Sequence, residues 1–344
     1  MLQLRNETPF RPGIFVFPDA QGVDTLIVAV KATFEIRGGV VAVAEQQRPL
    51  ALGDEAWGEP GRSSVKYAGE AHLPKPSTDV ALVGDAHAPR GRAAESVDVI
   101  VRVGPVQKAL AVFGDRVWRA GVASAGMSAP EPFLQMPLTY ERAFGGAHAP
   151  EGGPALFEER NPVGTGFRGE RAEWEMEGIR APNVEDPRQL VRDPDDRPPP
   201  AGVGFIAPSW EPRRSRAGTY DAAWLSDRAP FLPADFHPAF FNAAHPELVC
   251  PGFLRGGEPV EILNASPQGL LRFELPVCEL DVGVTIAGVL ERPPMRLETV
   301  LLEPGDLRLS LTFRGAVTVD KQALHVEEVR VGLARLVHDR RAAR

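Results

Sequence analysis

Residues 25–36 read TLIVAVKATFEI, and this stretch decides the fold class. Every second residue from Leu26 to Ile36 is apolar, while Thr25, Lys31, Thr33 and Glu35 fall on the opposite face of an extended chain. Successive side chains of a β-strand point to opposite faces of its sheet, so this period of two predicts a half-buried strand. Gly38 and Gly39 follow, and residues 40–44 are again apolar, which together predict a β-hairpin.

The same pattern recurs along the rest of the chain. It predicts three antiparallel strands at residues 97–103, 106–113 and 116–119. It also predicts two hairpins and a last strand, at residues 259–264 with 270–275, 297–302 with 307–314, and 329–333. Short helices are predicted only at residues 169–177 and 233–242.

Composition agrees with a β-rich chain. The 344 residues include 34 glycines and 34 prolines, about a fifth of the chain, against roughly 12 % in average usage. Eight prolines fall between residues 181 and 212, where each fixes φ and removes a backbone donor. We therefore predict a mainly β protein of antiparallel strands and hairpins, with long Pro/Gly-rich loops and few short helices. Two β-rich lobes of one continuous fold, residues 1–180 and 213–344, are expected to be joined by the proline-rich segment 181–212.

Charge and hydropathy exclude several classes of partner. The net charge of −8 argues against a nucleic-acid binder, which needs a basic surface to neutralise phosphates. No apolar run is long enough for a membrane span, and the N-terminus lacks the apolar stretch of a signal peptide. The expected location is the cytoplasm, with Cys250 and Cys278 reduced and buried.

No motif for catalysis or for cofactor binding is complete. The seven histidines are scattered, so no metal site is predicted. Ser124 lacks the leading glycine of a nucleophile elbow, and no phosphate-binding P-loop is present. Gly164, Gly166 and Gly169 match the spacing of a dinucleotide-binding loop, but no buried strand precedes them, so they predict a turn. We assign no catalytic, cofactor-binding or metal-binding residue and expect a protein that is not an enzyme.

Several segments instead mix aromatic residues with Arg, Asn, Asp and Gly without alternation. The candidate residues in these segments are Tyr140, Arg142, Phe144, Asn161, Tyr220, Asp221, Trp224 and Phe236. Such residues either tie ordered loops together through buried hydrogen bonds or form a surface that binds a partner. For Arg142, Asn161 and Asp221 we predict partly buried, hydrogen-bonded positions that hold loops in place.

The same segments resemble a bacterial family whose genes lie beside those for the spike of the type VI secretion system. The matching stretches are VKATF at 30–34, YERAFGG at 140–146, NPVG at 161–164, AGTYD at 217–221, LPADF at 232–236 and PGFLRGGE at 251–258. In this order they cover roughly residues 5 to 315. Phe313-Arg314 departs from the Trp-Arg pair that is usual in the family, a change that keeps an aromatic residue.

The resemblance implies an effector chaperone or adaptor. Such a protein binds a secreted effector with a PAAR-like region, keeps it soluble and helps to load it onto the VgrG spike, with VgrG itself a possible second partner. Strand addition and an aromatic-lined groove are both open as binding modes.

Two alternatives come from other classes of protein. One is a carbohydrate-active hydrolase that uses two carboxylates in one cleft. The other is a glycan-binding β module with exposed tryptophans; against it, we expect Trp57, Trp118 and Trp224 to be buried.

Overall fold

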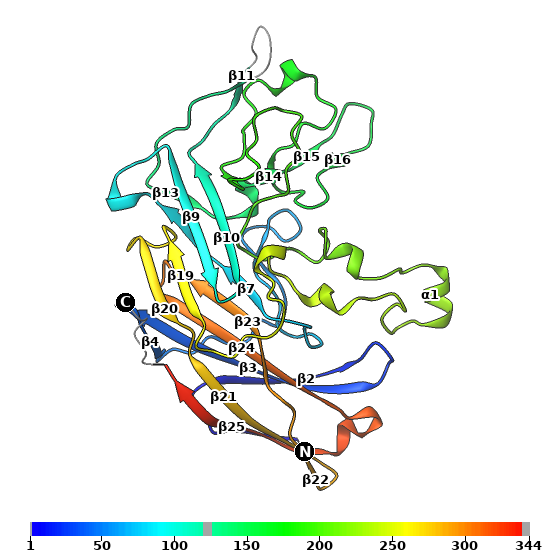
Figure 1. Cartoon of the computed structure of the whole chain (residues 1–344). Coiled ribbons are helices and arrows are strands. Elements are labelled where there is room, and N and C mark those ends of the chain that lie inside the picture. Colours follow the sequence, from blue (N-terminus) through cyan, green and yellow to red (C-terminus); the bar gives the residue numbers. More distant parts are fainter. Residues whose placement is uncertain (1, 120–125, 339–344) are drawn as a thin grey trace.

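The structure, a computed structural model, describes residues 2–119 and 126–338, and this part of the chain is mainly β (Figure 1). The largest sheet, here called the central sheet, has six strands. Its order is β2 (Arg11–Pro18), β3 (Asp24–Arg37), β24 (Arg308–Thr318), β23 (Arg296–Glu303) and β7 (Asp79–Leu82), with β4 (Val40–Val43) also paired to β3. All its pairs are antiparallel except that of β23 with β7. The hairpins predicted at 25–44 and 297–314 are thus confirmed.

Two further sheets complete the β framework. The second sheet has the order β18 (Val184–Glu185), β10 (Val106–Phe113), β9 (Ser96–Val103), β19 (Pro259–Leu263) and β20 (Leu270–Glu274). The third has the order β1 (Gln3–Asn6), β25 (Val326–Val337), β21 (Val277–Ile286) and β22 (Val289–Glu291). One hydrophobic core contains buried residues from all three sheets, such as Val28, Val101 and Val331.

The remaining elements are short. Five two-stranded pairs are β5 (Glu55–Ala56) with β6 (Val65–Tyr67), β8 (Asp85–His87) with β13 (Gln135–Pro137), β11 (Trp118–Arg119) with β12 (Gly126–Met127), β14 (Phe144–Gly145) with β17 (Thr165–Gly166), and β15 (Ala147–His148) with β16 (Leu156–Phe157). The single α-helix of the described residues is α1 (Ala222–Asp227). Short 3-10 helices are η1 (Pro89–Gly91), η2 (Tyr140–Arg142), η3 (Glu173–Met176), η4 (Arg214–Arg216), η5 (Pro238–Phe241), η6 (Pro246–Leu248) and η7 (Asp320–His325).

Three local predictions need correction. The predicted helices at 169–177 and 233–242 are only the 3-10 turns η3 and η5, and Pro238 at the start of η5 leaves room for a single turn. The third strand of the predicted meander at 116–119 does not join β9 and β10. Its residues form β11, which pairs with β12, because the chain turns away after Phe113.

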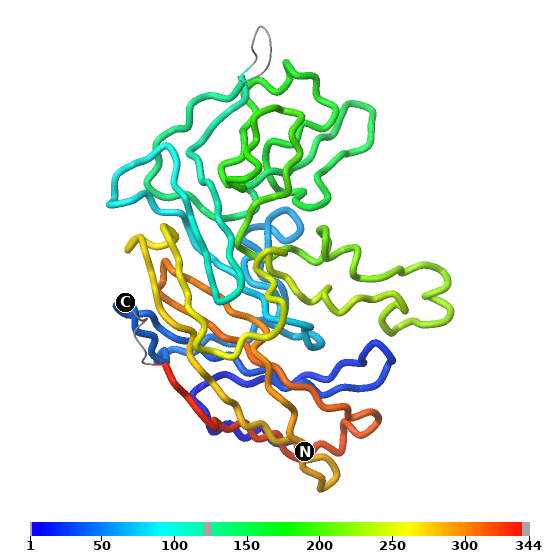
Figure 2. Tube along the Cα trace, in the orientation of Figure 1, coloured from blue at the N-terminus to red at the C-terminus, as the bar shows by residue number. Residues whose placement is uncertain are grey.

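The sheets also combine strands from the two lobes predicted on either side of residues 181–212. In the central sheet β3 lies against β24, so that Val30 is opposite Phe313. In the second sheet β9 lies against β19. Figure 2 shows the blue N-terminal strands beside the orange C-terminal strands in the lower part of the molecule. The boundaries at 181 and 212 therefore do not separate one sheet from another.

Strand β3 is more deeply buried than its alternating sequence predicted. β3 is buried on both faces, and Lys31 and Thr33 on the face expected to be polar are almost inaccessible to water. The segment between β4 and β7 covers that face and satisfies its polar groups. Lys31 Nζ lies 2.8 Å from Glu70 Oε2, and the amide of Thr33 donates to Gln47 Oε1 at 2.8 Å.

Two other features of the described residues bear on earlier expectations. Cys250 and Cys278 are both free and buried, as predicted. None of the helices has the length and apolar character required to cross a bilayer.

Candidate functional site: a two-part cleft and a projecting finger

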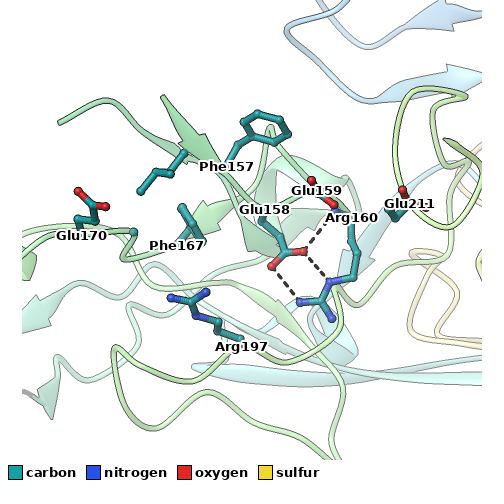
Figure 3. A pocket seen from close by; sticks show the side chains of 10 residues that line it. Phe157, Glu158, Glu159, Arg160, Phe167, Glu170, Arg197 and Glu211 are labelled. Carbon is teal, nitrogen blue, oxygen red and sulfur yellow. Dashed lines mark hydrogen bonds and ion pairs between the residues drawn. The ribbon is translucent and has the colours of Figure 1, made fainter. Parts of the chain in front are cut away.

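Two adjoining cavities form a cleft beside the proline-rich segment. The first, the polar cavity, has a volume of about 670 Å³ and is lined by Leu156, Phe157, Glu158, Glu159, Arg160, Phe167, Gly169, Glu170, Arg197 and Glu211 (Figure 3). The second, the proline cavity, has a volume of about 190 Å³ and is lined by Tyr140, Arg160, Pro199, Pro200, Ile206, Glu211, Pro212, His245 and Pro246. Arg160 and Glu211 line both cavities, so the two cavities adjoin at these side chains.

Asn161 holds the wall of this cleft together. Its side chain is fully buried, and Nδ2 donates to the carbonyl oxygens of Tyr140 at 2.7 Å and Phe144 at 3.0 Å. Only glycines fit around it: a Cβ on Gly145 would lie 2.2 Å from Asn161 O, and one on Gly164 would lie 2.4 Å from Nδ2. The segments 140–146 and 161–166, which stand apart in the sequence, are thereby fixed to one another.

Charged groups line the polar cavity. Arg160 donates from Nε to Glu158 Oε1 at 2.6 Å and from Nη2 to Oε2 at 2.9 Å, a two-point ion pair seen in Figure 3. Burial by itself would raise the pKa of Glu158, but the hydrogen bonds and positive charge of Arg160 outweigh burial and hold that pKa below its ordinary value. Glu158 is therefore a fixed carboxylate.

The carboxyl groups of the cleft bear on the hydrolase alternative. A glycosidase general acid needs a carboxyl group with a raised pKa. Both Glu158 and Glu211 have lowered pKa values. For Glu211, hydrogen bonds from Ser215 and the charge of Arg214 outweigh the opposing effect of burial. Neither carboxyl group is thus set up to donate a proton near neutral pH. No group of three or more His, Cys, Asp or Glu side chains in the described residues has the arrangement of a metal site.

Besides Arg160 and Glu211, which it shares with the polar cavity, the proline cavity has two polar side chains in its wall, Tyr140 and His245. The hydroxyl of Tyr140 is buried and has no hydrogen-bond partner in the described residues. His245 is buried as well; its Nδ1 accepts from the amide of Glu247 at 3.2 Å and so caps η6. Burial lowers the pKa of His245 to about 4, and the nearby Lys108 ammonium group adds to this effect. His245 is therefore neutral at pH 7.

This lowered pKa predicts a dependence of stability on pH. The unfolded chain takes up a proton at this imidazole near pH 6.5, whereas the folded protein does so only near pH 4. Stability is thus expected to fall as the pH drops from 6.5 to 4, by up to about 3 kcal/mol from this group. Urea unfolding of wild type and His245→Asn between pH 7.5 and 4.5 measures it, because Asn offers an oxygen acceptor in place of Nδ1 for the Glu247 amide and does not titrate. The free-energy difference between the two proteins should change with pH in favour of the variant at low pH; parallel curves would contradict the assignment.

The second part of the site is a projecting hairpin, residues 217–236, which we call the finger. It carries α1 and extends to the right in Figure 1. Asp235 closes its base by accepting from the amide of Thr219 at 2.9 Å and from the Thr219 hydroxyl at 2.7 Å. Near the tip, Trp224 Nε1 donates to Phe231 O at 2.8 Å, and the rings of Tyr220 and Trp224 meet edge to face with centroids 4.7 Å apart.

The finger exposes three large apolar side chains among polar ones such as Asp221 and Asp227. Tyr220 is 55 % exposed, Leu225 67 % and Phe231 39 %. Arg228 Nη2 donates to Ala20 O at 2.7 Å, which fixes the finger to the turn between β2 and β3. Isolated exposed apolar residues are ordinary, but several on one ordered projection mark a contact surface.

The structure divides the eight residues singled out from the sequence between interior and surface. Tyr140, Phe144 and Asn161 are buried, and Arg142 is partly exposed and pairs with Asp115 at 2.7 Å. The prediction of partly buried, hydrogen-bonded positions is thus confirmed for Arg142, while Asn161 is more deeply buried than expected. It is wrong in part for Asp221, which is exposed, although its side chain caps α1 by accepting from the Trp224 amide at 2.8 Å. The last two candidates, Trp224 and Phe236, are half-buried.

The expected burial of three tryptophans holds for one of them. Trp118 is fully buried, Trp224 is half-buried and Trp57 is 39 % exposed, with Lys66 Nζ 4.7 Å from its ring centroid. Trp57 directly follows β5, within a stretch at 52–62 in which every residue except Ala56 is exposed. Burial of the tryptophans therefore does not exclude the glycan-binding alternative.

Sequence reasoning missed most of the cleft. Arg197, Pro199 and Pro200 belong to the segment predicted as a connector, and His245 is one of the seven scattered histidines for which no site was predicted. The signal that could have indicated them was the density of prolines itself, because prolines supply rigid apolar walls without strands.

Comparison with known proteins identifies the family. Residues 21–314 match the family described as "Uncharacterized protein conserved in bacteria (DUF2169)". No curated protein and no solved structure matches the chain. Because the match spans most of the sequence, including the cleft and the finger, the chain belongs to this family of proteins conserved in bacteria.

Proposed function

We propose that the protein is a non-enzymatic chaperone or adaptor that binds a type VI secretion effector through its PAAR-like region. In this role it keeps the effector soluble and promotes its loading onto the VgrG spike. The proposal takes the effector from the sequence resemblance described above. The observation that carries a binding role is the ordered finger with exposed Tyr220, Leu225 and Phe231 side chains.

The finger is suited to binding because it is ordered before a partner arrives. The capped helix, the Thr219–Asp235 closure and the contact of Arg228 with Ala20 fix its aromatic side chains. A preorganised surface loses less conformational entropy on association, which leaves more of the apolar burial as net affinity. Tyr and Trp residues of this kind dominate the energetics of protein interfaces.

Substitutions on the finger test this role. Tyr220→Ala together with Leu225→Ala is expected to weaken binding of the PAAR-containing effector at least tenfold, because truncating central apolar contacts typically costs more than about 1 kcal/mol each. The measurement is calorimetric titration with a PAAR-containing effector, together with co-expression to measure the soluble fraction of that effector. Leu290→Ala is the matched control: Leu290 is 52 % exposed but lies on β22, away from the finger.

The binding experiment has three informative results. Loss of affinity in the finger variant but not in Leu290→Ala supports the proposal. An effector that neither co-purifies with the wild type nor gains solubility from it contradicts the proposed function. Equal affinities for wild type and finger variant place the binding surface elsewhere on the molecule.

A further inference from the structure

Two guanidinium groups flank one carboxylate in the polar cavity, and Arg160 is the one that forms an ion pair with it. Glu158 is held by Arg160 on one side, and Arg197 lies on its other side in Figure 3. The guanidinium carbon of Arg197 is 5.7 Å from the ring centroid of Phe167. Across residues 2–119 and 126–338, Arg197 donates no hydrogen bond and Arg160 Nη1 has no partner. This group of three side chains therefore keeps one uncompensated positive charge and unused donors.

The other charged groups that line the polar cavity are three carboxylates, two of them paired with an arginine. Glu159 and Glu211 are paired with the same residue, Arg214, at 3.0 and 3.1 Å. Glu170 lines the cavity beyond Phe167, and within the described parts of the chain its carboxylate has no partner. A ligand with a carboxylate is attracted to Arg197 and Arg160, while Glu170, farther along the cavity, repels it weakly or not at all.

The adjoining proline cavity adds an apolar component. Pro199, Pro200, Pro212, Pro246 and Ile206 supply most of its walls, and its volume of about 190 Å³ suits one bulky apolar side chain. Since Arg160 forms part of both cavities, an anionic group at the guanidinium pair and an apolar group in the proline cavity belong to neighbouring parts of one ligand.

We propose that the cleft binds an extended polypeptide segment that carries a carboxylate next to a bulky apolar residue. The carboxylate lies against Arg197 and the free edge of Arg160, because a guanidinium fork matches the two oxygens of a carboxylate. The apolar side chain fills the proline cavity. That this segment belongs to a secreted effector rests on the proposed function above; the ligand chemistry does not.

A displayed library of random heptapeptides, selected against the purified full-length protein, tests the proposal. The enriched peptides are expected to pair Asp or Glu, or a free C-terminal carboxylate, with Phe, Leu or Trp at an adjacent position. Synthetic peptides with amidated and with free C-termini distinguish a side-chain carboxylate from a terminal one. Arg197→Gln should weaken their binding about tenfold or more, the loss typical of a charge-assisted hydrogen bond.

Glu170→Gln is the matched control, since it removes a charge from the same cavity without touching the guanidinium pair. It should leave the affinity unchanged or raise it. Enrichment of Lys- or Arg-containing peptides that Glu170→Gln weakens would overturn the proposal, and so would the absence of any enriched sequence. If Arg197-dependent peptides appear but the effector does not bind, the cleft is a peptide site and the proposed function is wrong. If the effector binds equally well to wild type and to Arg197→Gln and no peptide is enriched, the proposed function stands and the cleft is not a peptide site.

Discussion

Arg314→Ala is expected to destabilise the protein by about 3–5 kcal/mol, because it leaves a buried carboxylate without its partner. Arg314 on β24 and Glu298 on β23 form an ion pair whose side chains are 1 % and 2 % exposed. Arg314 Nη2 also donates to Glu70 O at 2.6 Å, and Glu298 Oε1 accepts from the Lys75 amide at 2.9 Å. The substitution therefore removes one charge. It also leaves two buried acceptors, the Glu298 carboxylate and the Glu70 carbonyl oxygen, without the donor that Arg314 supplied.

The measurement is the free energy of unfolding by a chemical denaturant at pH 7. The decisive comparison is between the single variant Arg314→Met and the double variant that combines Arg314→Met with Glu298→Gln. Gln keeps the oxygen that accepts from Lys75 but carries no charge, so the double variant should be more stable than Arg314→Met alone. The surface pair of Arg272 with Glu261, whose side chains are 60 % and 36 % exposed, serves as control; Arg272→Ala should cost less than about 1 kcal/mol. A double variant no more stable than the single one would contradict the buried-charge explanation.

Asn161→Asp should cost at least about 3 kcal/mol although it changes almost no volume. The new carboxylate would place an oxygen where Nδ2 now donates to the carbonyls of Tyr140 and Phe144, in a position with no exposure to water. Two hydrogen bonds are lost and a charge is buried without a partner. Because these bonds hold the wall of the cleft, loss of peptide binding should accompany the loss of stability.

The pH dependence of this variant separates electrostatics from packing. Burial raises the pKa of the introduced carboxyl group, so the folded variant binds a proton more readily than its unfolded chain. Its stability deficit relative to wild type should shrink as the pH falls from 7 to 4.5, because the protonated group can again donate one hydrogen bond. Asn6→Asp, at an exposed position, is the control and should cost less than about 1 kcal/mol. A deficit at position 161 that is independent of pH would point to a steric cause instead.

The β-hairpins could be predicted because the pattern that forms them is local. Alternation at 97–103 and 106–113 and the turn at Ser266 to Gly269, where Gly269 N donates to Ser266 O at 2.9 Å, bring together residues that are close in sequence. The arrangement of these hairpins into sheets was not accessible in this way. The pairing of β3 with β24 joins residues nearly 300 positions apart, and strands of either lobe satisfy the same alternation.

The candidate site was predictable in its parts but not in its shape. The dense segments around Tyr140, Asn161 and Tyr220 drew attention by composition, yet two of these three residues proved to be internal supports. The residues that give the cleft its chemistry, Arg197 and the prolines beside it, come from a segment that the sequence presented as a connector. Their role depends on which distant segment packs against them.

The strand at residues 24–37 shows both sides of this division. Its alternation determined an extended chain with one apolar face, since opposite side-chain directions follow from the backbone of a single strand. The burial of the second face depends on tertiary structure. Glu70, which lies 39 residues further along the chain, pairs with Lys31 and so compensates the burial of the Lys31 ammonium group. The conformation of the backbone is determined largely by neighbouring residues, whereas the environment of a side chain depends on the distant segments that pack over it.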